Sequence, residues 1–213
     1  MKSPTVLLLL AASSALAQGT FVNLDFEQAT VPPTPVGVFG SFVDPAVAFP
    51  GWTPGGFTNF PTSIGTVVLY NDISLGAPYI TLIGPDFPNV TGFSSIQGCY
   101  SVVMGYFAGL GVPPTLSQTG LVPADAKSIS LAGFVSALML NSVNVPLFAT
   151  QGGRLEGDVS SFAGHTAQLT FTGQGYFDDI QFSPVAIPEP SVLTLFALGT
   201  VLLTWRFLRQ TRP

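Results

Sequence analysis

The sequence contains one histidine, His165, and one cysteine, Cys99, the side chains best suited to nucleophilic catalysis. A Ser-His-Asp site would have to use His165, but this residue follows Gly164 in an expected exposed turn, and the sequence has no Gly-x-Ser-x-Gly elbow. Cys99 stands at the expected start of a strand without a basic neighbour to activate its thiol, so we expect a small buried side chain. Nucleophilic catalysis is therefore not favoured.

Sugar chemistry needs other residue types. Glycoside hydrolysis requires two carboxylates about 5–10 Å apart in a cleft. Asp178 and Asp179 are adjacent on an expected strand, where alternate side chains point to opposite faces, so they make a poor pair. Sugar binding uses exposed aromatic rings, and Trp52 is the best single candidate, although we favour a packing role for it.

The composition indicates an all-β protein that avoids nucleic acid. Of 213 residues only 8% are charged, and the middle of the chain is rich in Phe, Val, Thr, Ser, Gly and Pro, which favours short strands and turns. Residues 18–187 contain two basic residues, Lys127 and Arg154, against ten acidic ones, a formal charge of −8. Such a body repels phosphate backbones, so we expect no nucleic-acid partner.

Residues 1–17 have the three parts of a secretory signal peptide. Lys2 supplies a positive start, an apolar stretch follows, and Ala15 and Ala17 provide the small residues that signal peptidase needs. We expect a signal helix that is cleaved before Gln18. A helix of the core is the alternative, but strand-like sequence begins at Thr20.

The end of the chain predicts a single transmembrane helix at about residues 191–208. Residues 191–205 carry no charge, and a helix extended to Leu208 approaches the roughly 30 Å hydrocarbon core if the flanking arginines snorkel. Arg206, Arg209 and Arg212 in the basic tail 206–213 stop the helix and place the C-terminus in the cytoplasm. A buried helix of a soluble fold would not explain these arginines.

Residues 186–213 resemble the PEP-CTERM protein-sorting signal. The likeness consists of Pro188-Glu189-Pro190, the short apolar helix and the basic tail, in that order. It implies recognition by an exosortase in a Gram-negative bacterium that makes exopolysaccharide. The expected location is the inner membrane, with the ectodomain in the periplasm, followed by transfer to the cell surface or extracellular matrix.

Between these signals, residues 18–185 predict one domain, an antiparallel β-sandwich. Residues 21–27 alternate, with Val22, Leu24 and Phe26 expected on one face of a first strand. Further apolar runs separated by turn residues predict strands at 65–70, 78–83, 100–107, 128–135, 166–172 and 176–182. The regular spacing favours a sandwich over βαβ units.

Four motifs of this domain resemble the galactose-binding-like jelly rolls, which include many carbohydrate-binding modules. They are Asn23-Leu24-Asp25-Phe26-Glu27, Pro50-Gly51-Trp52, the stretch Gly157–Gly164, and Phe177-Asp178-Asp179-Ile180. Leu24 replaces the usual glycine, and His165 stands where glutamine is common. The likeness implies a jelly-roll-like sandwich in which the first and last strands are neighbours.

The same resemblance implies a structural calcium ion held by Glu27, Asp178 and Asp179. Calcium takes about six to eight oxygen ligands, which carboxylates and backbone carbonyls can supply. The alternative is that these are solvated acids at strand ends. Taken together, we expect an exported, exosortase-sorted, non-catalytic protein of the surface or matrix that either binds exopolysaccharide or contributes to the envelope or matrix as a building component. The alternative function is a secreted hydrolase of unrecognised type.

Overall fold

The computed structural model describes residues 18–31, 42–56, 68–73, 78–87, 93–105, 112–150 and 152–187. Strands dominate these ranges, and their helices are the four-residue α1 (Pro45–Ala48) and the 3-10 turn η1 (Ser160–Phe162). The predicted all-β class is confirmed. No helix in the described ranges is long and apolar enough to cross a membrane. The predicted signal peptide 1–17 and the predicted sorting motif, membrane helix and basic tail within 188–213 lie outside the described residues.

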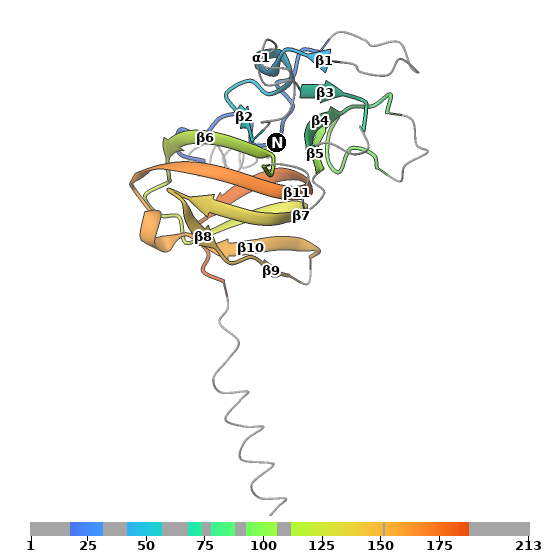
Figure 1. The fold of residues 1–213 in the computed structure, drawn as a ribbon. Coiled ribbons are helices and arrows are strands. Elements are labelled where there is room, and N and C mark those ends of the chain that lie inside the picture. The colour runs from blue at the N-terminus through green and yellow to red at the C-terminus, as the bar shows by residue number, and fades with distance from the viewer. Residues whose placement is uncertain are drawn as a thin grey trace, which may run out of the picture.

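The described strands join through hydrogen bonds into one large mixed sheet (Figure 1). Its main path runs in the order β1-β3-β4-β5-β11-β7-β10-β9, while β6 pairs with β11 and β2, and β8 pairs with β7. The strands are β1 (Phe42–Val43), β2 (Thr53–Gly55), β3 (Val68–Tyr70), β4 (Tyr79–Ile83), β5 (Ser101–Gly105), β6 (Thr115–Leu121), β7 (Ser128–Leu140), β8 (Val143–Val145), β9 (Phe148–Ala149), β10 (Arg154–Asp158) and β11 (Thr166–Ser183).

The long strand β11 organises the sheet because it has three neighbours. Residues 166–172 pair with β6, residues 175–177 pair with β5, and β7 pairs along most of the strand. Two strands thus follow one another along the same edge of β11, and the sheet divides there into a β6–β2 branch and a branch through β5. Figure 1 shows β11 in orange between these branches and β7.

Most of the predicted strands are present, with altered limits. The segment 78–83 matches β4, and 128–135 is the first part of a longer β7. The segments 65–70 and 100–107 correspond to β3 and β5, with residues 65–67 and 106–107 outside the described ranges. The segments 166–172 and 176–182 are one strand, β11, while β1, β2, β6, β8, β9 and β10 were not predicted.

The predicted first strand, residues 21–27, is wrong. Asn23 and Phe26 have left-handed backbones, with φ of 51° and 57°, so the segment turns instead of extending. Leu24 and Phe26 are buried as expected, but Val22 is 47% exposed. The backbone of Val22 pairs with the side-chain amide of Gln118, which donates 3.0 Å to the Val22 carbonyl and accepts 2.7 Å from its N–H.

The expectation of a wholly antiparallel sheet is also wrong, since β3 and β4 are parallel. The cause lies at Asn71, which follows β3 with φ of 49°. Its N–H donates to the Leu82 carbonyl at 3.0 Å, and its side-chain oxygen accepts from the Gly84 N–H at 2.7 Å. The end of β3 therefore lies beside the end of β4, and the chain has to return before it can begin β4.

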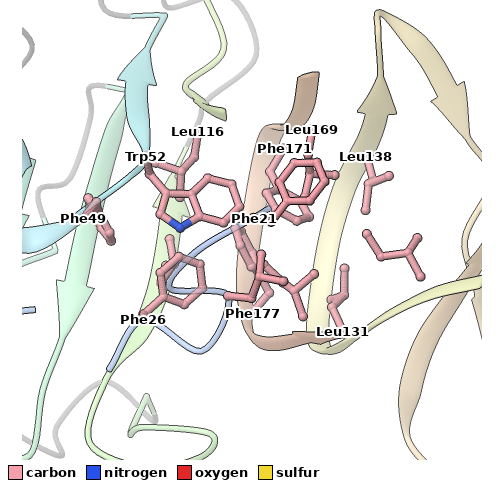
Figure 2. Close-up of a cluster of buried hydrophobic side chains, with 14 of the residues drawn as sticks. Phe21, Phe26, Phe49, Trp52, Leu116, Leu131, Leu138, Leu169, Phe171 and Phe177 are labelled. Atoms are coloured by element: carbon pink, nitrogen blue, oxygen red, sulfur yellow. The ribbon is translucent and has the colours of Figure 1, made fainter. Parts of the chain in front are cut away.

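An aromatic cluster fills the core next to β11. Phe171 and Phe177 of that strand have ring centroids 4.4 Å apart, and the Phe26 ring lies 6.0 Å from Phe177 and 5.6 Å from Trp52. The Trp52 ring is in turn 5.9 Å from Phe171. Figure 2 shows these side chains turned toward one another. Contacts of this kind join the N-terminal segment, the loop before β2 and the last strand into one core.

We expect Phe171→Ala to lower the free energy of unfolding by about 3–5 kcal/mol, because a buried ring at the centre of the cluster is lost and leaves a cavity. Urea denaturation measures this change. The control is Phe42→Ala, which removes a ring that is 61% exposed and should change stability by about 0.5 kcal/mol or less. Equal effects of the two substitutions would contradict the described core.

Candidate functional site

A β-bulge places the two adjacent acids of β11. Asp178 pairs with Ala132 and Gln181 with Ser130, so β11 has one residue more than β7 between these pairs. Asp179 takes up the extra length with φ of 48°. Phe177 before the bulge and Ile180 after it are both buried, and the Ile180 N–H donates to the Leu24 carbonyl at 3.0 Å. The bulge thus connects the last strand to the N-terminal segment.

Asp178 is fully buried and holds the segment 97–101 against β11. Its Oδ2 accepts from the Gln97 N–H at 3.1 Å and from the Ser101 hydroxyl at 2.9 Å. Its Oδ1 accepts from the Asp179 N–H at 2.7 Å. Burial raises the pKa of Asp178 to about 6, although these hydrogen bonds favour the ionised form and limit the rise.

Glu27 holds the same segment from the N-terminal side. Its Oε1 accepts from the backbone N–H groups of Cys99, at 2.7 Å, and Tyr100, at 2.9 Å. Gly98 makes this approach feasible, because its φ is 60° and a Cβ there would lie 2.3 Å from Glu27 Oε1. Cys99 itself is exposed, so the prediction of a buried side chain was wrong. Its N–H faces Glu27 while its thiol remains at the surface.

Asp179 belongs to a different set of partners. Its Oδ2 lies 2.6 Å from Nη1 of Arg154, and its Oδ1 accepts from Nε2 of Gln181 at 2.7 Å. The Arg154 guanidinium also donates to the Asp179 carbonyl and, at 3.1 and 3.2 Å, to the Ser130 hydroxyl. One arginine therefore fixes both the carboxylate and the backbone of the bulge.

The described contacts of Glu27, Asp178 and Asp179 are with protein groups. The hydrogen-bonded oxygens of all three carboxylates face protein donors, and one of the acids is paired with a guanidinium. Within the described ranges, no group of three or more His, Cys, Asp or Glu side chains is arranged to hold a metal ion. The structure explains the positions of the three acids without calcium, and the calcium site stays a prediction.

The other predicted residues lie where packing places them. Trp52 is only 5% exposed, and its indole N–H donates to the Asn23 carbonyl at 3.0 Å, so it is a core residue and not an exposed platform for sugar. His165 is exposed in a turn, as expected. Gln18, the predicted first residue after cleavage, accepts at its side-chain oxygen from the Phe182 N–H at 3.3 Å.

Comparisons with family models, with curated proteins and with solved structures found no match to this chain. The site is therefore characterised by the chemistry of its own residues. Its carboxylates bind backbone N–H groups and a guanidinium, which is the chemistry of a structural junction. Arg154 is the member of this junction that the sequence patterns did not single out, although it is the only arginine in residues 18–187.

Replacement of Arg154 by Met keeps most of the side-chain length and removes the guanidinium. We expect the free energy of unfolding to fall by about 1–3 kcal/mol, because the largely buried Asp179 carboxylate and its carbonyl lose their donor. Lys127→Met is the matched control, since it removes the other basic residue of the domain from an exposed position. If both variants unfold at the same urea concentration, Arg154 does not hold the bulge.

The pKa of Asp178 predicts a specific pH dependence. Between its ordinary value of 3.8 and about 6, the folded protein holds a proton that the unfolded chain releases. The contribution of this group to stability is therefore largest at low pH and is lost as the pH rises through about 6. Between about pH 4.5 and 7, the urea midpoint of Asp178→Asn should fall less steeply with rising pH than that of the parent chain. An unchanged slope would contradict the raised pKa.

Proposed function

We propose that this chain is an exported, exosortase-sorted protein of the cell surface or extracellular matrix, which has no catalytic role and binds exopolysaccharide. The observation that carries the proposal is the order of Pro188-Glu189-Pro190, an uncharged apolar segment and three arginines, in a chain that begins with a signal-like segment. Each part has a physical role: export, arrest in the membrane and presentation of a cleavable motif outside it.

The ends of the described domain support attachment through one terminus. Gln18 contacts Phe182 of the last strand, and the Lys127 N–H donates to the Ser183 carbonyl at 2.8 Å, so the start and the end of the domain are secured close together. An all-β body of this kind can be held at a surface by the segment after residue 187. We also propose that the domain is a jelly-roll-like sandwich that closes around the aromatic core.

A secreted hydrolase is the alternative. The acids of the site described above, Glu27, Asp178 and Asp179, have backbone N–H groups, a hydroxyl, an amide and Arg154 as their partners, which does not favour a role as general acid and base. Turnover of a polysaccharide by the purified protein, lost in Asp178→Asn, would favour the hydrolase over the binding protein.

The proposal predicts that the Pro-Glu-Pro motif controls the fate of the protein. In cells that contain an exosortase, replacement of residues 188–190 by three alanines should leave an unprocessed, membrane-associated precursor. Fractionation and mass spectrometry of the mature chain measure this. Pro184→Ala is the control, because it changes a nearby proline outside the motif and should leave processing unchanged. Release of the triple-alanine variant at the normal level would overturn the proposed sorting.

A further inference from the structure

The face of β7, β10 and β11 that points away from the core can be traced through the strand register. Residues paired on neighbouring strands share a face, and so do residues two apart on one strand. Ile129 and Leu131 are fully buried, so Ser130, Ala132 and Phe134 of β7 lie on the opposite side, called here the outer face. By register, this face continues through the residues Arg154 and Glu156 of β10, Phe148 of β9, and Tyr176 and Asp178 of β11, where residues 93–101 cover part of it.

Aromatic rings stand at two places on the outer face. Phe148 is 60% exposed and Phe134 is 51% exposed. Tyr176 is paired with Phe134 in the register, and its ring packs edge-on against Phe93 at 5.0 Å. The Tyr176 hydroxyl donates to the Ser94 carbonyl, which fixes this ring beside Phe134. Two exposed phenylalanines thus lie on one face, one of them next to an anchored tyrosine.

Polar side chains with planar hydrogen-bonding groups lie near the rings in the strand register. Glu156 is paired with both Ser130 and Phe148, and Arg154 is paired with Ala132. Gln181, opposite Ser130 on β11, is exposed. Aromatic faces flanking carboxylate, amide and guanidinium groups suit a ligand that has both apolar C–H surfaces and hydroxyl groups. The pyranose rings of a polysaccharide have this chemistry.

The charges on the domain decide between neutral and acidic polysaccharides. Arg154 is already paired with Asp179 at 2.6 Å, and the one other basic residue within 18–187 is Lys127. Ten acidic residues give the same range its formal charge of −8. A polyanion would gain little attraction and meet net repulsion, whereas a neutral chain would meet neither.

We propose that the outer face, with Phe134, Tyr176 and Phe148 around Glu156, Arg154 and Gln181, binds a neutral polysaccharide. This inference rests on the proposed function and assigns its polysaccharide to a surface formed by β7, β9, β10 and β11. The rings contact the C–H faces of sugar units, while Glu156 and Gln181 exchange hydrogen bonds with hydroxyl groups and Arg154 stays paired with Asp179.

Affinity gel electrophoresis of the full chain in mild detergent tests this assignment, with laminarin and galactomannan as neutral probes and alginate as the acidic one. At least one neutral probe should retard the protein, and alginate should not. Phe134→Ala and Phe148→Ala should each weaken the retardation about fivefold or more, because each removes one stacking ring. Both rings are exposed, so the variants should keep the melting temperature of the parent chain.

Phe42→Ala is the matched control, since Phe42 is equally exposed but belongs to β1, at the other end of the strand order. Retardation that is lost equally in Phe42→Ala, or kept in both outer-face variants, overturns the assignment but leaves polysaccharide binding in place. No retardation by either neutral probe, or stronger retardation by alginate, overturns the inference itself. Self-association that requires Phe148 would instead make the face a contact between copies. None of these results affects the sorting assay on residues 188–190, so the two proposals fail separately.

Discussion

The bulge at Asp178 and Asp179 is the constraint on which the rest of the domain depends. It adds one residue to β11, and the strand can then bury Phe177 before the irregularity and Ile180 and Phe182 after it. The same distortion leaves the Ile180 N–H available for the Leu24 carbonyl, so the N-terminal segment is held by the last strand. A regular strand would keep strict alternation from Phe177 onward. Ile180 and Phe182 would then both lie on the face opposite to Phe177, outside the core.

The acids around the bulge are held by hydrogen bonds and one ion pair. A carboxylate removed from water is costly unless hydrogen bonds replace its hydration. Asp178 meets this need with two backbone N–H groups and a hydroxyl, while the exposed Glu27 accepts from two further N–H groups. Because the donors of Glu27 and most of those of Asp178 come from residues 97–101, satisfying the carboxylates also fixes that segment. Gly98 is essential to the arrangement, since any side chain there would collide with Glu27.

Sequence patterns were sufficient for the class of the fold and for part of its connectivity. Apolar runs located β4 and β5, which are buried along almost their whole length, and most of β7 and β11. Alternation failed at residues 21–27, where the left-handed backbones of Asn23 and Phe26 turn an alternating sequence into a bend. It failed again at β10, whose short polar sequence is recruited to the sheet by pairing with β7. The jelly-roll resemblance implied that the N-terminal segment and the last strand are neighbours. The role of Arg154 could be seen only in the three-dimensional structure, since no local pattern pairs it with Asp179.

The position of the outer face connects the two proposals physically. Ser128 begins β7 on the same face as Ser130, and its hydroxyl donates to the Val185 carbonyl at 2.8 Å, shortly before the chain continues toward residue 188. The proposed glycan surface therefore lies next to the point where the chain leaves the domain. A protein held at a surface through that end would present the face close to its attachment. The negative charge of the domain would oppose association with other anionic surface components and leave aromatic stacking and hydrogen bonding to select the ligand.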